Sequence, residues 1–373
     1  MDVKKRMLFV IPNLGGGGAE KVLVNLCNCL NKNKYDVTIL TLFKAGVNAQ
    51  FLDDSVKLIE GNVKQFRGNS HLMKLFSPKF LYRFFIKNEY DCIIAYLEGP
   101  AARIVSGCTH PKTKLVSWIH CEQSLKEAVA SFRSREEARR CYMRFDKIVC
   151  VAETVRTNFM NYFDVSKNST VIYNVVDSIG LKNKALECIN DNPFNDGLKI
   201  VSTGRLINLK GYDRLINIHR RLLDNGIKNQ VYILGRGELQ HYFESDIIRF
   251  GIKDTFHLLG FHANPYKYMA HADLFVCSSR KEGISTAVTE ALILGLPVVS
   301  TNCSGTTELL GEHNEYGIVT ENDEESLYHG VITMLSGNNL LYYKNKSIER
   351  GKMFSKEKCV LAAEKLFDSL IYE

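Results

Sequence analysis

The 373-residue chain lacks any apolar run near the roughly 20 residues that a membrane-spanning helix needs. Its eleven cysteines include no C-x-x-C pair and no metal-ligand spacing. Several cysteines lie inside apolar runs, where a thiol acts as a small hydrophobic group. Internal repeats and low-complexity segments are also absent. These absences predict a cytoplasmic globular protein with neither a membrane span nor a disulfide framework.

The basic residues before Met7–Ile11 resemble the start of a secretory signal. The apolar stretch is too short for one, has no small-residue cleavage site and runs directly into a glycine loop. We therefore expect it to form the first buried strand of an α/β domain.

Positive charge is concentrated in the first half of the chain. Residues 1–178 hold 26 Lys/Arg and 17 Asp/Glu, a balance of +9, whereas residues 179–373 hold 22 and 24, a balance of −2. The first half is therefore where an acidic partner is expected.

Strand-length apolar runs alternate with helical segments through both halves, which predicts two parallel sheets with crossover helices. The expected fold is α/β, with two Rossmann-like, doubly wound domains. The expected boundaries are 1–178 for the acceptor-side domain, 179–197 for a linker, 198–353 for a nucleotide-sugar domain and 354–373 for a helix that crosses back. The expected strands are 7–12, 37–43, 92–97, 114–119 and 147–151 in the first half, and 198–203, 230–234, 273–277 and 297–301 in the second.

The strongest local motif is Glu282-Gly283-Ile284-Ser285 followed by Glu290, after a strand that ends near Cys277. A helix that starts near Ser285 would offer backbone N–H groups to a diphosphate, and Gly283 would permit close approach. Glu282 would lie on the loop and Glu290 inside the helix, so the two carboxylates could hold sugar and ribose hydroxyls. Taken alone, both could equally be solvent-facing charges beside a buried helix.

Two further loops follow strands in the same half. The Arg205 guanidinium could bind a diphosphate as a planar fork, and the Lys210 ammonium could bind it as a point charge. Both residues could equally be solvated loop cations. Gly235, in Gly-Arg-Gly, could let a ligand approach the backbone or mark only a tight turn.

Together these loops resemble the family 4 retaining glycosyltransferases of bacterial surface-polysaccharide type, which have the GT-B fold, with two domains that face each other across a cleft. The resemblance spans nearly the whole chain and includes the glycine loop from Asn13 to Glu20, Trp118-Ile-His120 and the E-x7-E pair. It implies that Glu282 approaches donor-sugar hydroxyls, Glu290 binds the ribose, and Arg205 and Lys210 hold the diphosphate.

The resemblance also implies less specific roles. Gly16 and Gly17 would face the donor, His120 would line the sugar pocket, and Phe261 and His262 would lie near the base. A lone histidine after an apolar strand is also a common packed residue, and positioning is favoured over proton transfer. The chain departs from the family pattern at 174–177 and 305–308, which leaves the geometry of those loops open.

No D-x-D occurs in the sequence, so nothing resembles the usual acidic Mg²⁺ or Mn²⁺ site of sugar-nucleotide enzymes. Arg205, Lys210 and a helix N-terminus can supply the positive charge instead. We expect no metal and no cofactor besides the donor substrate. The family resemblance implies retention, with the leaving phosphate assisting attack on the same face.

Residues 64–90 combine six Lys/Arg, one Glu and seven aromatic residues. The segment suits an interfacial helix on anionic lipid or, equally, a core helix with a basic solvated face. Contact with the inner leaflet of the plasma membrane and a lipid-linked saccharide acceptor would explain it. Glu98 could reach an acceptor or cap a helix.

The sequence thus predicts an enzyme, a hexosyltransferase that moves a hexose or N-acetylhexosamine from a UDP-sugar in capsule, lipopolysaccharide or related polysaccharide synthesis. A sugar-nucleotide 2-epimerase and a non-catalytic nucleotide-sugar-binding protein are the alternatives. No nucleic-acid recognition motif is present. The sequence does not indicate the donor sugar, acceptor, linkage or oligomeric state.

Overall fold

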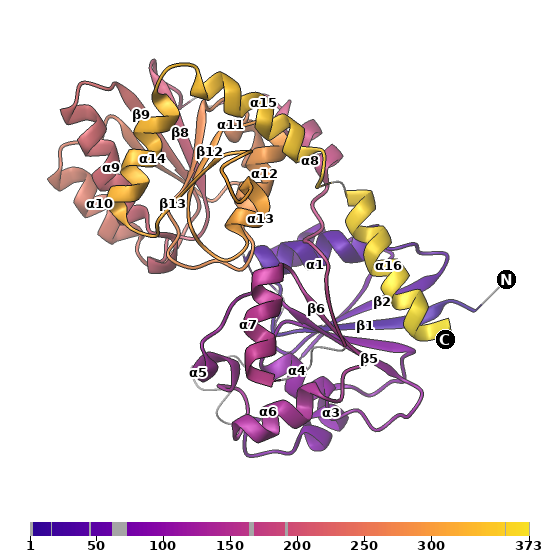
Figure 1. The fold of residues 1–373 in the computed structure, drawn as a ribbon. Helices are drawn as coiled ribbons and strands as arrows, with labels where there is room; N and C mark the ends of the chain where they lie inside the picture. Colours follow the sequence, from indigo (N-terminus) through magenta and orange to yellow (C-terminus); the bar gives the residue numbers. More distant parts are fainter. Residues whose placement is uncertain are drawn as a thin grey trace. The chain divides into compact units, whose positions relative to one another are not determined.

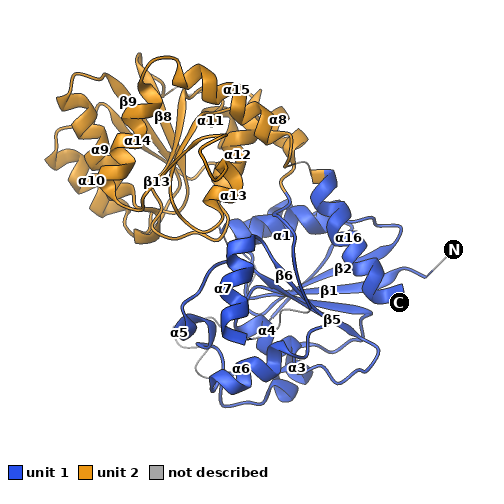
Figure 2. Cartoon of the chain, in the orientation of Figure 1, with its two compact units in different colours: residues 1–175, 357–373 blue, residues 176–356 orange. Residues whose placement is uncertain are grey.

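The computed structural model of the chain describes residues 3–15, 17–44, 46–61, 73–163, 168–190, 193–354 and 356–372. The chain forms two compact units, one of residues 1–175 with 357–373 and the other of residues 176–356 (Figure 2). No helix in the described ranges is both long and apolar enough to cross a membrane.

Unit 1 is built on a parallel seven-stranded sheet in the order β3-β2-β1-β4-β5-β6-β7 (Figure 1). Its strands are β1 (Lys5–Ile11), β2 (Tyr35–Thr41), β3 (Lys57–Glu60), β4 (Cys92–Tyr96), β5 (Lys114–Ile119), β6 (Lys147–Cys150) and β7 (Ser169–Val171). Its helices are α1 (Gly18–Cys29), η1 (Val47–Phe51), α3 (Pro78–Phe85), α4 (Pro100–Val105), α5 (Leu125–Ala128), α6 (Arg135–Tyr142), α7 (Glu153–Phe163) and the last helix, α16 (Lys356–Tyr372).

Helix α16 packs on the sheet of unit 1 although it is the end of the chain. The buried ring of Phe367 contacts Phe9 and Tyr35 edge-on at centroid distances of 6.2 and 6.3 Å. The Glu364 carboxylate accepts a hydrogen bond from the Asn31 backbone N–H at 2.7 Å. These contacts make the C-terminal helix part of the first unit's core.

Unit 2 has a parallel six-stranded sheet in the order β10-β9-β8-β11-β12-β13. Its strands are β8 (Leu198–Thr203), β9 (Asn229–Leu234), β10 (Phe256–Gly260), β11 (Leu274–Cys277), β12 (Val298–Thr301) and β13 (Ile318–Thr320). Its helices are α8 (Ser178–Ala185), η3 (Asn208–Lys210), α9 (Tyr212–Asp224), α10 (Gln240–Arg249), α11 (Tyr266–Met269), α12 (Thr286–Leu294), α13 (Thr306–Leu310), α14 (Glu324–Leu335) and α15 (Asn339–Gly351).

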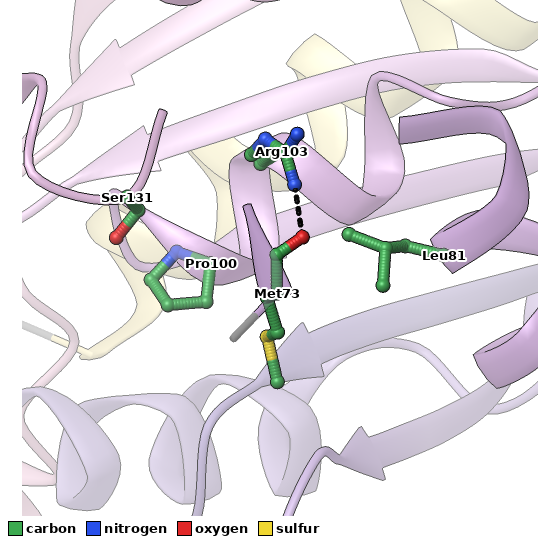
Figure 3. Close-up of a pocket in the computed structure, with 5 residues that line it drawn as sticks. All are labelled: Met73, Leu81, Pro100, Arg103 and Ser131. Carbon is green, nitrogen blue, oxygen red and sulfur yellow. Dashed lines mark hydrogen bonds between the residues drawn. The ribbon is translucent and has the colours of Figure 1, made fainter. Parts of the chain in front are cut away.

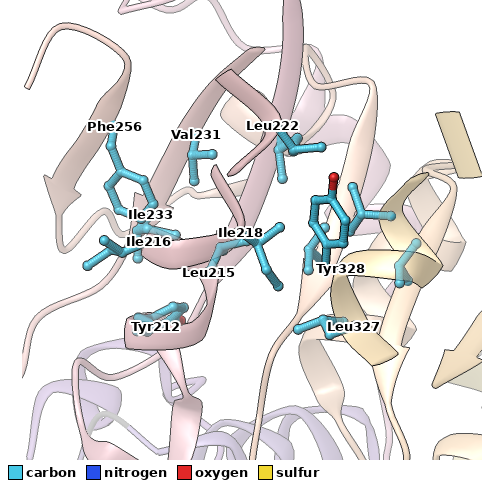
Figure 4. Packing of buried hydrophobic residues seen from close by; sticks show 14 of the residues in the cluster. Tyr212, Leu215, Ile216, Ile218, Leu222, Val231, Ile233, Phe256, Leu327 and Tyr328 are labelled. Atoms are coloured by element: carbon cyan, nitrogen blue, oxygen red, sulfur yellow. The ribbon is translucent and has the colours of Figure 1, made fainter. Parts of the chain in front are cut away.

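The core of unit 2 lies between the sheet and helices α9 and α14. Leu215 and Ile218 of α9 pack with Ile233 of β9 and Leu327 of α14 (Figure 4). The buried residues of α9 include Tyr212, Leu215, Ile216 and Leu222, at helical spacing, so the helix places one continuous face on the core.

The segment expected to be a linker, 179–197, begins inside helix α8. Asp177 caps this helix, because its carboxylate accepts the Gly180 N–H at 3.2 Å. Leu181 and Ala185 are buried, and the Asn264 side chain donates to the Lys184 carbonyl at 2.8 Å. Helix α8 therefore belongs to unit 2 and packs beside α11 instead of serving as a free connection.

The two parallel sheets share one strand order, in which successive strands are first added on one side of the unit's first strand and then on the other. The change of side lies between β1 and β4 in unit 1 and between β8 and β11 in unit 2. Ligands of doubly wound proteins bind at the carboxyl ends of the strands at such a switch point. The prediction of two doubly wound Rossmann-like domains is confirmed.

Candidate active site

The loops that follow β8 and β11 meet at the switch point of unit 2. The Ser278 hydroxyl donates to the Lys210 carbonyl at 2.8 Å, and the Arg280 N–H donates to the Leu209 carbonyl at 2.8 Å. Gly211 has φ +65°, and a Cβ on it would lie 2.1 Å from the Ser278 carbonyl oxygen. Only glycine allows this close contact, which places Lys210 next to the 278–285 loop.

Lys210 and Glu282 form an ion pair across this switch point. The Lys210 Nζ lies 2.5 Å from Glu282 Oε1, and the Ser279 hydroxyl donates to the same oxygen at 2.7 Å. Burial alone would lower the pKa of Lys210, but the Glu282 charge outweighs that effect and raises the pKa. Two of the predicted donor-binding residues are thus in direct contact, with Lys210 held in its charged form.

A second ion pair braces the same two loops. Arg280 donates to both carboxylate oxygens of Asp213, at 2.8 and 2.5 Å. Burial would raise the pKa of Asp213, but the Arg280 guanidinium holds it below its ordinary value. Arg280 lies two residues before Glu282, but the sequence does not predict its contact with Asp213, which is 67 residues away.

Arg205 lies on the loop after β8 and its side chain is exposed. Gly235 follows β9, and a Cβ there would lie 1.9 Å from the Gly204 carbonyl oxygen. The need for glycine at position 235 therefore comes from packing of two loops of the chain. Phe261 is exposed after β10, and His262 contacts the Tyr268 ring at a centroid distance of 4.6 Å.

Helix α12 begins at Thr286, as expected, and the Ser285 hydroxyl caps it by accepting the Val288 N–H at 3.4 Å. Glu290 lies within this helix and is buried. Its Oε1 accepts a hydrogen bond from the Tyr266 hydroxyl at 2.9 Å. Tyr266 is therefore a residue of the site that sequence reasoning missed, since no motif marks it.

Gly283 and Ile284, also expected at the donor site, pack against the N-terminus of α13. A Cβ on Gly305 would lie 2.9 Å from the Gly283 carbonyl oxygen and 3.1 Å from the Ile284 Cβ. The 282–285 loop therefore contacts Lys210 through Glu282 and the start of α13 through Gly283 and Ile284.

In unit 1, His120 follows β5 and is buried beside Tyr96 and Trp118. The Tyr96 ring lies 4.6 Å from the His120 ring and 5.3 Å from the Trp118 ring, measured between centroids. Burial lowers the pKa of His120 to about 3, so its imidazole is neutral at physiological pH. Within the described ranges, no hydrogen-bond partner reaches His120 Nε2, Tyr96 Oη or Trp118 Nε1.

Glu98 lies next to this group at the β1 and β4 switch point. Its Oε2 accepts the His120 backbone N–H at 3.0 Å, and its Oε1 accepts the Cys121 thiol at 2.8 Å. The carboxylate thus ties the loop after β4 to the loop after β5. Cys121 was not expected from the sequence in this role.

The glycine loop after β1 is described in part. The Asn13 side chain accepts the Gly15 N–H at 2.9 Å, and a Cβ on Gly17 would lie 2.1 Å from Glu20 Oε2. Gly16 lies outside the described residues. In the rest of the chain that the structure describes, no three His, Cys, Asp or Glu side chains are grouped as a metal site.

Comparisons with known proteins identify the class. The model of Glycosyltransferase Family 4 matches residues 16–178, and that of Glycosyl transferases group 1 matches residues 188–352. The chain belongs to the family 4 glycosyltransferases and is a hexosyltransferase-type enzyme. The predicted family is confirmed.

Among its relatives is N-acetylgalactosamine-N,N'-diacetylbacillosaminyl-diphospho-undecaprenol 4-alpha-N-acetylgalactosaminyltransferase of Campylobacter jejuni. It is 29% identical over 372 residues, covering 95% of this chain and 97% of the relative.

Two solved structures show the GT-B fold over nearly the whole chain. Anabaena HepE, in complex with UDP and glucose, has a TM-score of 0.78 at 20% identity and covers 98% of this chain and 100% of its own. Sucrose-phosphate synthase of Thermosynechococcus elongatus has a TM-score of 0.81 at 14% identity and covers 99% and 100%.

Proposed function

We propose that this glycosyltransferase moves a hexose or N-acetylhexosamine from a UDP-sugar to a lipid-linked saccharide in cell-surface polysaccharide synthesis. The observation that carries the proposal is the ion pair of Lys210 and Glu282 at the switch point of unit 2. The Campylobacter relative, whose named acceptor is a diphospho-undecaprenol saccharide, supports the choice of acceptor.

The pair suggests how the donor binds. A diphosphate carries more negative charge than one carboxylate, so Lys210 can exchange Glu282 for a phosphate oxygen while Arg205 approaches from the same loop. Glu282 then becomes free to accept hydrogen bonds from sugar hydroxyls. Both side chains are largely buried, which strengthens these interactions relative to water.

Glu290 is proposed to bind the ribose, with the Tyr266 hydroxyl fixing its carboxylate. The neighbouring loop with Phe261 and His262 is proposed to contact the base. Positive charge from Arg205, Lys210 and the N-terminus of α12 stabilises the departing nucleoside diphosphate, so the reaction is proposed to need no added metal.

His120 is proposed to hold a sugar hydroxyl and not to transfer a proton. A buried polar atom without a partner costs about 1–3 kcal/mol. His120, Tyr96 and Trp118 each carry an atom that no partner reaches from the described part of the chain. Sugar hydroxyls are both donors and acceptors, so they can satisfy all three. Glu98 positions this group through the His120 backbone and is not proposed to touch the acceptor itself.

The stereochemical proposal is retention, by attack on the face that the nucleoside diphosphate leaves. The protein is proposed to work in the cytoplasm at the inner leaflet, with part of the segment 64–90 on the membrane. Residues 64–72 of that segment lie outside the described residues.

A panel assay tests the proposal. The protein is incubated with individual sugar nucleotides with and without membrane lipid extract, and both released nucleoside diphosphate and labelled lipid are measured. A glycosyltransferase releases UDP and labels lipid only when extract is present. Release of UDP without any acceptor, with an epimerised sugar, would indicate a 2-epimerase, and tight binding without turnover would indicate a non-catalytic protein.

A further inference from the structure

A row of phenylalanines is exposed on unit 1, on helix α3 and the turn before it. Phe76, Phe80 and Phe84 stack in sequence, with centroid distances of 5.0 and 6.4 Å between neighbouring rings. Phe80 and Phe84 are 50% and 52% exposed, and Leu75 beside them is 73% exposed. Large apolar side chains gathered in this way on a surface mark an interaction site.

The opposite face of α3 is its core face. Leu81 and Tyr82 are buried, as is Ile86 just beyond the helix. The helix therefore has a settled orientation in which the phenylalanine row points outward. The aromatic residues at 76, 80 and 84 are therefore not core residues, and α3 combines a core face with an exposed face that is both aromatic and basic.

Cations accompany the phenylalanine row. Residues 73–88 contain four Lys/Arg and no Asp/Glu. Lys79, Arg83 and Lys87 are exposed, and the Lys87 ammonium lies 5.8 Å from the centroid of the Phe84 ring. An anionic bilayer has an apolar interior under negatively charged headgroups. Apolar rings surrounded by positive charge match both layers, because the rings can enter the interior while the cations contact the headgroups.

Two arginines hold the turn that carries Leu75 and Phe76. Arg103, which is buried, donates to the Met73 carbonyl at 2.8 Å (Figure 3). It also donates to the Phe76 carbonyl at 2.8 Å. Arg133 donates to the Lys74 and Leu75 carbonyls at 2.6 and 2.9 Å. Four consecutive carbonyls are therefore bound by guanidinium groups.

Glu137 joins the two arginines. Its carboxylate pairs with the Arg103 guanidinium at 3.0 Å and accepts the Arg133 backbone N–H at 2.6 Å. A buried ion pair costs desolvation, so a fold gains little stability from it unless it fixes a conformation. Here it fixes a turn whose apolar side chains face outward.

We infer that Leu75, Phe76, Phe80 and Phe84, with Lys79, Arg83 and Lys87, form a docking surface for an anionic lipid bilayer, and that Arg103, Arg133 and Glu137 hold it in shape. This deepens the proposed function, since a membrane contact is part of it. The surface consists only of unit 1 residues and binds lipid without donor or acceptor.

Co-sedimentation of the full chain with vesicles tests the surface. Phosphatidylcholine vesicles with and without phosphatidylglycerol are compared, in the absence of sugar nucleotide. Binding is expected only with phosphatidylglycerol, and F80S/F84S and K79E/R83E are each expected to weaken it at least tenfold. The matched controls F51S and K112E/K126E, which change exposed residues of the same unit, are expected to bind as the unchanged chain does.

The role of the arginines is tested by R133K, which keeps the charge but cannot donate to two carbonyls as a planar fork. It is expected to weaken vesicle binding several-fold, whereas R139K on α6 has no effect. UDP binding, measured on every variant, reports folding and the donor site separately.

Three results would overturn the inference. The first is equal binding to both vesicle types, and the second is unchanged vesicle binding by F80S/F84S. The third is a dimer that F80S/F84S dissociates with no vesicle binding in the unchanged chain, which would assign the face to a second copy. None of these results bears on the transferase assay, so the proposed transfer reaction would stand or fail by itself.

Discussion

The two units place very different groups at equivalent positions of the same strand order. At the unit 2 switch point the side chains are charged and paired, with Lys210 on Glu282 and Arg280 on Asp213. At the unit 1 switch point a neutral histidine lies with two aromatic residues whose polar atoms have no partner among the described residues. One backbone plan thus supports an ionic site and a neutral hydrogen-bonding site.

The difference follows from what each site is proposed to hold. A diphosphate must be neutralised, and paired charges can exchange partners when it arrives. Sugar hydroxyls carry no charge, so a neutral imidazole is a better partner for them than an imidazolium that would first have to be desolvated. The predictions below test this contrast, beginning with the largest effect.

Replacing Glu282 with Gln is expected to reduce transfer by about 10²–10³-fold, because a carboxylate that acts on the sugar in the transition state is lost. UDP affinity is expected to change by only a few-fold. Turnover is measured as UDP release with lipid extract, and Glu312→Gln, an exposed change in unit 2, is the control. A loss of UDP binding as large as the loss of turnover would place Glu282 on the nucleotide instead.

The stability of the protein is expected to fall by about 2 kcal/mol between pH 7.5 and pH 5 through His120 alone. Burial lowers the folded-state pKa of His120 from 6.5 to about 3, so in this range only the unfolded chain takes up the proton. Stability therefore decreases as the pH falls, and this contribution levels off only above about pH 7.5.

Thermal unfolding of the unchanged chain and of His120→Gln at pH 7.5 and pH 5 measures the effect. The variant should show a smaller acid shift than the unchanged chain. His219 in unit 2, whose pKa burial lowers to about 4, contributes its own acid shift to both proteins and cancels in the comparison. Equal acid shifts would mean that His120 is charged or exposed in the folded protein.

Replacing Tyr266 with Phe removes the hydrogen bond to Glu290 and is expected to weaken UDP binding about fivefold, or about 1 kcal/mol. The carboxylate remains but loses this hydrogen bond. Titration calorimetry with UDP measures this, with Tyr342→Phe as an exposed control in the same unit. If Tyr266→Phe binds UDP as tightly as the control, the ribose assignment of Glu290 loses its structural support.

The smallest expected effect is that of EDTA on transfer, which should be none, since cations of the protein are proposed to neutralise the diphosphate. The assay compares initial rates before and after chelation. Loss of activity with rescue by Mn²⁺ would contradict this part of the account.

The sequence predicted interior structure better than edges. The strands named from the sequence include every interior strand of both sheets and none of the four edge strands, β3, β7, β10 and β13. Interior parallel strands are buried on both faces and form continuous apolar runs. Edge strand β3, by contrast, is exposed along its whole length, so it has no such run.

For the site, the sequence predicted residues that lie on loops after strands but not the contacts that hold them. Lys210 and Glu282 were each expected at the donor, and their pairing appears only when two loops 72 residues apart meet. The contact of Tyr266 with Glu290, and the two arginines behind the phenylalanine row, depend on how helices pack. No spacing within the sequence encodes those contacts.

The central claim is that unit 2 binds the donor diphosphate through its charged loop, and titration of UDP and UMP tests it most directly. The unchanged chain should bind UDP more tightly than UMP. Arg205→Ala should lose at least tenfold in UDP affinity and most of this preference, while His120→Gln should bind UDP normally. Equal UDP affinity of Arg205→Ala and the unchanged chain, or no preference for UDP over UMP, would contradict the account.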